Sequence, residues 1–316
     1  IRRPPRSTLF PYTTLFRSDV GLTATPPKSR TLRKSPVTAT TIDHQTPDGQ
    51  TIHTAIAGTG APLLCLHGHP GTGACFDPVM EPLRDRYRIV APDLRGYGQS
   101  PTKSPFEMEA HIGDLISLLD RLELDTCTIV GWSLGGIIAM ELAIRYPDRV
   151  NALALIATAA RPRSDHPAIS PIALGMTAIA GLTSAIVPAA GFLPAIAQRS
   201  LLRYLISQHT PTSYKNIGQY GVAAFQQTTT FAHQALNAAI RQRYDREADL
   251  GAIACPSLVV AAADDRHICA TASRRTAERL PNCEWIYYEN AAHLFPWEMP
   301  DRLRADLTSW LDRHGL

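Results

Sequence analysis

The sequence lacks the cysteine patterns of metal sites and of disulfide scaffolds. Its six cysteines include no C-x-x-C pair and no spacing that is typical of metal ligands. Cys65, Cys127 and Cys283 fall in or beside apolar runs, where a cysteine is usually a small buried hydrophobe. The sequence therefore predicts no bound metal and a reduced chain of the cytoplasm, although a bridge between Cys269 and Cys283 stays open.

Signals for nucleotides, nucleic acids and export are also missing. The stretch Gly58-Thr59-Gly60 is followed by neither a lysine nor the start of a helix, so a phosphate-binding loop is not predicted. No stretch near the start combines a basic flank with the apolar core of a signal peptide. We therefore expect no cofactor and no nucleic-acid partner.

The first 18 residues differ in composition from the rest of the chain. Residues 8–18 match the in-frame translation of a common sequencing-library adapter, which predicts that residues 1–18 are an artefact of bulk, metagenomic sequence data. The alternative is a real basic targeting arm. Without the four arginines of this stretch the chain has 27 basic and 28 acidic residues, a formal charge of −1. Residues 19–40 are rich in Pro, Ser and Thr without apolar periodicity, and we expect a disordered leader there.

From residue 41 onward, short apolar runs alternate with helical patterns. A turn at Pro47-Asp48-Gly49 joins two extended runs, which predicts an opening hairpin. Continuous apolar runs predict strands that are buried on both faces, at residues 62–66, 87–92, 127–130, 152–156, 256–261 and 285–288. Helical patterns cover residues 108–122, 136–146 and 296–314. Strands that alternate with helices indicate an α/β protein with a doubly wound, mostly parallel sheet.

The alternation stops between residues 161 and 250, where the sequence predicts only helices and loops. We interpret residues 161–250 as a helical cap, inserted into an α/β core made of residues 41–160 and 251–316. Residues 167–198 contain no charged side chain, and the rival interpretation is a transmembrane helix. Three prolines leave at most 16 uninterrupted residues there, fewer than the roughly 20 that a membrane span needs.

The chain is organised around the stretch Gly131-Trp132-Ser133-Leu134-Gly135-Gly136, which lies between an apolar run and a helical pattern. Between a strand and a helix, G-x-S-x-G forms the nucleophile elbow, because small residues around the serine allow a strained turn that exposes its hydroxyl. Ser133 is then a candidate nucleophile. The alternative is a serine that caps the helix after an ordinary glycine turn.

Four further motifs accompany this turn in a fixed order: His67-Gly68-His69-Pro70-Gly71, Asp93-Leu94-Arg95-Gly96-Tyr97-Gly98-Gln99-Ser100, Ala263-Asp264-Asp265 and Ala292-His293. With them, residues 41–315 resemble an α/β-hydrolase of the branch that carries a cap after the sixth strand. The resemblance implies an eight-stranded sheet and a catalytic triad of Ser133, Asp265 and His293, in the chain order of that family. In such a triad the histidine takes the serine proton and the carboxylate holds the histidine in place.

Three aspartates compete for the place of the triad acid. Asp264 and Asp265 are adjacent, and the family spacing favours Asp265, which lies four residues before Cys269, at a position where the family usually has proline. Asp264 and Asp165 stay as alternatives, the latter because some members carry their acid after the preceding strand. Ala262 stands where the acid turn of the family usually has glycine.

The resemblance also implies an oxyanion hole formed by the backbone N–H groups of His69 and Leu134. Leu134 would begin the elbow helix, where the helix dipole also favours negative charge. Trp132 and the side chain of His69 are candidate substrate contacts. For both side chains the alternative is plain packing, of Trp132 in the core and of His69 against the cap.

The other motif residues are expected to have structural roles. The segment Asp93–Ser100 is architectural in the family, and His67 is expected to be a structural hydrogen bonder. We expect the remaining histidines, among them His111, His209 and His233, on the surface or in the cap.

Taken together, these residues predict an enzyme that hydrolyses carboxylic esters through an acyl-serine intermediate. The charge-free part of the cap would line a pocket for the hydrophobic acyl or aryl group of a small-molecule ester. Alternatives within the fold are hydrolysis of a lactone or enol-lactone, cleavage of a carbon–carbon bond beside a ketone, and perhydrolysis. A non-catalytic ligand-binding protein is the alternative from another class. Epoxide and haloalkane hydrolysis are disfavoured, because those enzymes have an aspartate where Ser133 stands.

The expected partner is the small-molecule ester itself. A monomer and a homodimer both fit the sequence. No membrane span is expected, although peripheral contact with a membrane stays open.

Overall fold

The computed structural model describes residues 39–168 and 170–316. The expectations for the adapter-like segment, and for all but the end of the leader, lie outside these described residues. The first strand begins at Thr40, one residue before the core was expected to start.

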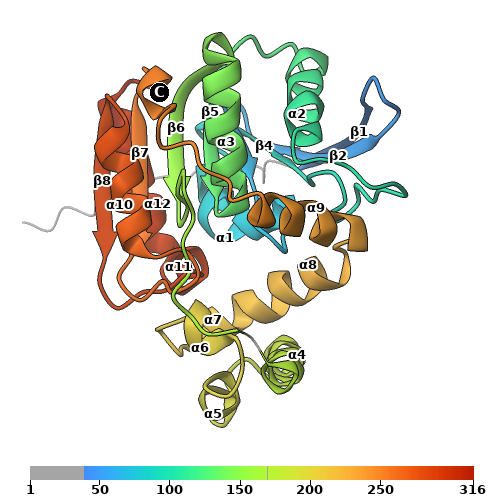
Figure 1. The fold of residues 1–316 in the computed structure, drawn as a ribbon, viewed down its shortest axis with the longest axis vertical. Coiled ribbons are helices and arrows are strands. Elements are labelled where there is room, and N and C mark those ends of the chain that lie inside the picture. The colour runs from blue at the N-terminus through green and yellow to red at the C-terminus, as the bar shows by residue number, and fades with distance from the viewer. Residues whose placement is uncertain (1–38, 169) are drawn as a thin grey trace, which may run out of the picture. The chain divides into compact units, whose positions relative to one another are not determined.

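Eight strands form one sheet, in the spatial order β1-β2-β4-β3-β5-β6-β7-β8. The strands are β1 (Thr40–Gln45), β2 (Thr51–Ala57), β3 (Ala61–Leu66), β4 (Tyr87–Pro92), β5 (Cys127–Trp132), β6 (Val150–Ile156), β7 (Ser257–Ala262) and β8 (Cys283–Tyr288) (Figure 1). The β1–β2 and β2–β4 pairs are antiparallel, and the other pairs are parallel. This sheet confirms the predicted α/β fold and its opening hairpin.

The apolar runs form strands because alternate side chains can be buried on opposite faces of the sheet. In β3, Leu63 and Cys65 pack on one face, with α1 (Asp77–Met80) and α12 (Pro300–Arg313). Leu64 and Leu66 pack on the other face, with α2 (Ala110–Arg121) and α3 (Leu134–Arg145). The sheet is therefore covered on both sides, which leaves the edge at the carboxyl ends of its strands for the loops that carry chemistry.

Two further helices and several short turns complete the core. The helix α10 (Ala270–Arg279) lies between β7 and β8, and α11 (Phe295–Glu298) precedes α12. Single 3₁₀ turns are formed by Gly73–Phe76, Glu81–Leu83, Pro147–Arg149 and Leu250–Ala252.

Between β6 and β7 the described residues form helices and no strand. The helices are α4 (Pro171–Ile186), α5 (Leu193–Ala197), α6 (Leu202–Leu205), α7 (Pro211–Asn216), α8 (Val222–Gln226) and α9 (Thr230–Arg241), with a π-helical turn at Ile217–Gly221. Figure 1 shows α4 to α8 gathered beyond the carboxyl ends of β6 and β8. In the part of the chain that the structure describes, no helix combines the length and the apolar character needed to cross a membrane.

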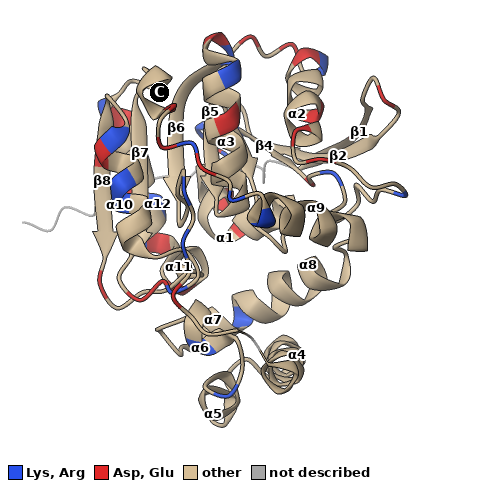
Figure 2. Ribbon diagram, viewed as in Figure 1, with Lys and Arg blue, Asp and Glu red and all other residues tan. Residues whose placement is uncertain are grey.

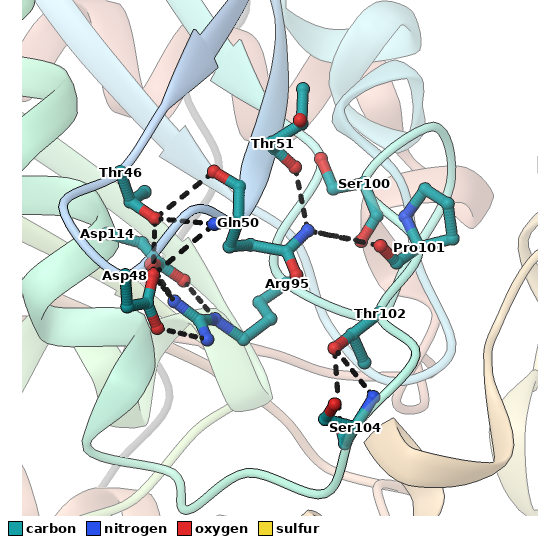
Figure 3. A network of polar contacts seen from close by, with 10 residues as sticks. All are labelled: Thr46, Asp48, Gln50, Thr51, Arg95, Ser100, Pro101, Thr102, Ser104 and Asp114. Atoms are coloured by element: carbon teal, nitrogen blue, oxygen red, sulfur yellow. Dashed lines mark hydrogen bonds and ion pairs between the residues drawn. The ribbon is translucent and has the colours of Figure 1, made fainter.

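The motif Asp93–Ser100, which follows β4, forms a polar network rather than a reactive site. The Arg95 guanidinium donates to Asp114 of α2 (Nε to Oδ2, 2.9 Å) and to Asp48 of the β1–β2 turn (Nη1 to Oδ2, 2.7 Å) (Figure 3). Asp93 accepts from the backbone N–H groups of Gly73 and Gln99, at 2.7 and 2.8 Å. These contacts tie a turn, a loop and a helix together, which agrees with the architectural role expected for the motif.

Candidate active site

Ser133 lies in a strained turn between β5 and α3. Its backbone dihedral angles are φ 54° and ψ −114°, an unusual conformation for a residue with a side chain. The Ser133 N–H donates to the Ile156 carbonyl at 2.9 Å, and the Thr158 hydroxyl donates to the Ser133 carbonyl at 2.8 Å. The end of β6 therefore holds the backbone of the turn, and the strain is compensated by the surrounding structure.

Two glycines around Ser133 allow the turn to close. A Cβ atom on Gly131 would lie 2.5 Å from the Gly135 carbonyl oxygen, and one on Gly135 would lie 1.8 Å from the Leu66 carbonyl oxygen. Any side chain at either position would force the backbone apart. The G-x-S-x-G spacing thus has a steric cause: α3 starts in direct contact with both β5 and the end of β3.

His293 connects Ser133 to a buried carboxylate. The Nε2 atom of His293 is 3.1 Å from Ser133 Oγ, and Nδ1 is 2.8 Å from Asp265 Oδ2. The other carboxylate oxygen, Oδ1, accepts from the backbone N–H groups of His267 (2.9 Å) and Ile268 (2.8 Å). Because Asp265 is an acceptor, His293 carries its proton on Nδ1, and Nε2 is free to accept the serine proton.

The two alternative acids lie elsewhere. Asp264 is exposed, and its Oδ2 accepts from the Ser207 hydroxyl at 2.8 Å. Asp165 is exposed as well, and pairs with Arg266 at 3.0 Å. Of the three candidate aspartates, Asp265 is the one that the structure brings to the ring of His293.

His267 lies beside His293, and His166 lies beside His267. The ring centroid of His267 is 4.7 Å from that of His293, and His267 Nδ1 is 3.3 Å from His166 Nε2. Burial, and to a smaller extent the nearby imidazoles of His293, His166 and His69, lower the pKa of His267 to about 3. His267 is therefore neutral at physiological pH and adds no positive charge beside His293. The sequence analysis missed this residue, although it lies only two positions after Asp265.

A chain of hydrogen bonds connects the core to α9 through His69. Tyr97 Oη is 2.8 Å from His69 Nδ1, and His69 Nε2 is 3.0 Å from His233 Nδ1. The fully buried Tyr97 hydroxyl must donate to His69, since its proton would otherwise lack an acceptor. His69 then donates to His233, whose own N–H is left on Nε2. Burial lowers the pKa of His69 to about 3, so this ring is neutral.

Trp132 is both packed in the core and part of the site. Its Nε1 atom donates to the His293 carbonyl at 3.4 Å, and its ring meets Trp297 edge-on, with centroids 5.1 Å apart. The same side chain lines the cavity described below. The indole therefore supports the loop that carries His293.

Glu298 ties that loop to the helices between β6 and β7. Its buried carboxylate accepts from the backbone N–H groups of Ala292 (3.0 Å), Ser207 (2.8 Å) and Gln208 (2.5 Å). Burial raises the pKa of Glu298, and the three backbone hydrogen bonds oppose this shift. Sequence reasoning missed Glu298, because no local pattern shows that residue 298 meets residues 207 and 208.

Ser133 and His293 open into a cavity of about 1570 Å³. Trp132 and His69, the two candidate substrate contacts, also line it. The helices between β6 and β7 contribute mostly apolar residues, including Leu174, Leu182, Leu202, Leu205, Ile217 and Val222. No group of three or more His, Cys, Asp or Glu side chains within the described ranges is placed to hold a metal ion.

The order of the sheet and the strained serine turn after its fifth strand define the α/β-hydrolase architecture. A family model described as the alpha/beta hydrolase fold matches residues 61–300, and the chain belongs to that family.

Individual relatives carry the names of hydrolytic enzymes. The chain is 29% identical over 251 residues to "Putative carbamate hydrolase RutD" of Agrobacterium fabrum, a match that covers 79% of this chain and 92% of that protein. A thermophilic esterase from Thermogutta terrifontis superposes with a TM-score of 0.65 at 27% identity, over 87% and 98% of the two chains. The enol-lactonase from Burkholderia xenovorans LB400 gives a TM-score of 0.66 at 20% identity, over 86% and 100%, which shows a shared fold.

His111 contradicts the expectation that the remaining histidines lie on the surface or in the cap. It is fully buried in α2, and neither ring nitrogen has a hydrogen-bond partner. Burial, and to a smaller extent electrostatic repulsion by His67 and Arg95, lower its pKa to about 3. A clue is present in the sequence: His111 shares the apolar stripe of Leu115 and Leu118 at helical spacing.

We expect this buried imidazole to weaken the fold in mild acid. The unfolded chain binds a proton at His111 below about pH 6.5, whereas the folded chain does so only near pH 3, so stability falls as the pH falls between these values. His111→Leu should remove about 1 kcal/mol of the stability lost between pH 6 and pH 5. Urea unfolding of both proteins at these two pH values measures the difference. Equal losses in the two proteins would show that His111 does not contribute.

Proposed function

We propose that the protein is a serine hydrolase that cleaves carboxylic esters. The observation that carries the proposal is the hydrogen-bonded series from Asp265 through His293 to Ser133, which opens into a cavity large enough for an organic substrate. Ser133 Oγ attacks the ester carbonyl while His293 Nε2 takes the hydroxyl proton, and the departing alcohol receives that proton. Water then attacks the acyl-serine with His293 as base, which releases the acid and restores Ser133.

The negative charge that develops on the carbonyl oxygen needs donors close to Ser133. We assign this role to the backbone N–H groups of Leu134 and His69. Leu134 is the first residue of α3, where N–H groups have no partner within the helix and the helix dipole favours an anion. The loop of His69 packs directly on the serine, since a Cβ atom on Gly68 would lie 3.2 Å from Ser133 Cβ.

We propose that residues 161–250 act as the cap and select the substrate. Their contribution to the cavity is largely apolar, and the neutral pair His69–His233 supplies hydrogen bonding without charge. The lining also includes charged residues near the end of the segment, Arg241, Arg243 and Asp245. Beside the apolar residues of α4, α6 and α8, however, a charged acyl group would lose its hydration without an ion pair, whereas an alkyl or aryl group would bury apolar surface. Hydrophobic acyl or aryl esters are therefore the proposed substrates.

We expect the specificity constant kcat/KM for aryl esters to rise with acyl length from two to about six carbons. Each methylene that becomes buried should contribute up to ~0.8 kcal/mol, about fourfold in kcat/KM, until the acyl site is full. A hexanoyl ester compared with a succinyl half-ester of similar length isolates the effect of charge. A series that is flat or falls from the start would rule out an extended apolar acyl site.

A carbamate is the second candidate substrate. The relative named as a carbamate hydrolase matches this chain over 92% of its own length, and attack on a carbamate carbonyl would use the same serine, histidine and oxyanion donors. Aryl carbamates that match the aryl esters in size distinguish the two. A higher kcat/KM for the carbamates would reassign the reaction and keep the catalytic residues.

A further inference from the structure

The helix α4 buries small residues and exposes large apolar ones, which is the reverse of an ordinary surface helix. Its buried face is made of small residues: Ala173, Ala180, Gly181 and Ser184. Its large side chains face solvent instead, and Ile172, Ile179 and Ile186 are 78%, 50% and 80% exposed. These three isoleucines are seven residues apart and fall along one line of the helix. A helix that buried its apolar stripe in the protein would show the reverse pattern.

The exposed apolar side chains concentrate on the same part of the molecule. Eleven large apolar residues are exposed among the described residues, and nine of them lie between residues 166 and 244. Those on α4 and the turn after it are Ile172, Leu174, Ile179, Leu182, Ile186, Val187 and Phe192. We call these seven residues the α4 patch. Single exposed apolar residues need no explanation, but a contiguous group of this size marks an interaction surface.

Charge identifies the kind of partner. The 79 residues from His166 to Tyr244 contain no aspartate or glutamate, and their five charged side chains are Arg199, Arg203, Lys215, Arg241 and Arg243. Figure 2 shows α4 free of charge, with basic positions close to α5, α6 and α7 and no acidic position on these helices. This part of the protein combines exposed isoleucines with cations and has no acidic residue. Its complement is a partner that has an apolar interior and a negatively charged outer layer.

We propose that the α4 patch docks the protein on an anionic lipid bilayer. The isoleucines would enter the boundary between head groups and acyl chains, while Arg199, Arg203 and Lys215 would meet lipid phosphates. A second copy of the chain fits less well, because a symmetric contact would place the cations of one copy against those of the other without an acid to pair them. The helix is also too short to span a bilayer, so it lies on the surface.

The docked face borders the cavity. Leu174 and Leu182 belong to the α4 patch and also line the cavity. Phe225 of α8, which is exposed but outside the patch, lines the cavity as well. An apolar ester dissolved in the bilayer could pass along these side chains to Ser133 without crossing water. This part of the inference rests on the proposed ester hydrolysis, whereas the docking itself does not.

Co-sedimentation of the full chain with vesicles tests the docking. Phosphatidylcholine vesicles that contain about one-third phosphatidylglycerol should sediment the protein, pure phosphatidylcholine vesicles much less, and high salt should weaken the binding. The double variant Ile179→Glu/Ile186→Glu should bind the anionic vesicles at least about tenfold more weakly. These two side chains lie outside the cavity lining, so the turnover of a water-soluble acetate ester should keep its parental value.

The matched control is Tyr146→Glu/Tyr287→Glu, which adds the same two charges at exposed tyrosines outside the α4 patch. It should bind vesicles like the parent. Equal binding by the parent and the double variant, or none by the parent, would overturn the docking. Self-association that the double variant abolishes in analytical ultracentrifugation, without vesicle binding, would show that a second copy covers the patch. Vesicle binding is measured without substrate, so its failure is distinct from a failure of ester hydrolysis.

Discussion

Ser133→Ala is expected to lower ester turnover about 10⁴-fold or more while the fold is kept. Removal of a triad nucleophile leaves only substrate binding and the oxyanion donors to accelerate the reaction. Alanine can occupy the turn with the same strain as serine, and the backbone contacts of Ser133 with Ile156 and Thr158 stay in place. The melting temperature should therefore stay close to that of the parent, and initial rates on an aryl ester measure the loss.

Ser164→Ala provides the control for this variant. Ser164 also lines the cavity, but its hydroxyl donates to the Arg266 carbonyl. Its removal should change turnover by less than about threefold, because it has no place in the series from Asp265 to Ser133. If Ser133→Ala kept more than a tenth of the parental rate, the serine mechanism would be wrong. A protein that binds esters without turnover would show the same low rate before and after the change.

Asp265→Asn is expected to cost about as much, close to 10⁴-fold in kcat. The backbone N–H groups of His267 and Ile268 require an acceptor, so the amide oxygen of the asparagine would take the place of Oδ1. Its NH₂ group would then face His293 Nδ1 and force that nitrogen to accept. The ring proton moves to Nε2, and His293 can no longer take the proton of Ser133.

Asp264→Asn is the matched control, one residue away. Asp264 accepts from the Ser207 hydroxyl, which an asparagine oxygen can also do, so turnover should fall by less than about tenfold. A large loss in this variant alone would move the acid by one position. Small losses in both variants would redirect the assignment to Asp165, although Asp165 pairs with Arg266 in the structure.

The parts of the molecule that the sequence predicted well are those determined by neighbouring residues. The run 87–92 was predicted as a strand and forms β4 with the same bounds, because continuous apolar residues suit a strand that is covered on both faces. The glycines of the Ser133 turn are visible in the sequence because the steric demand lies within a few positions. Asp265 and His293 were named from family order, and the structure brings both to one edge of the sheet.

The contacts that the sequence did not predict join residues that are far apart in the chain. His69 meets His233 across 164 positions, and Glu298 meets Ser207 across 91. A polar residue shows nothing locally about a partner at such a distance. The α4 patch escaped prediction for another reason. The apolar content of residues 167–198 was visible, but content alone does not tell which face of a helix turns inward when the small residues also form a stripe.

Glu298 makes the helices between β6 and β7 less exchangeable than a simple insertion. Its carboxylate reaches the loop of His293 and the backbone of residues 207 and 208 at the same time. A chimera that received the equivalent segment of a relative would have to present two backbone N–H groups at the same place. Without them a buried carboxylate would lose partners, and the loop that carries His293 would be the first to shift. Residues 161–250, the proposed cap, therefore depend on residue 298, outside the segment, for their attachment to the loop of His293.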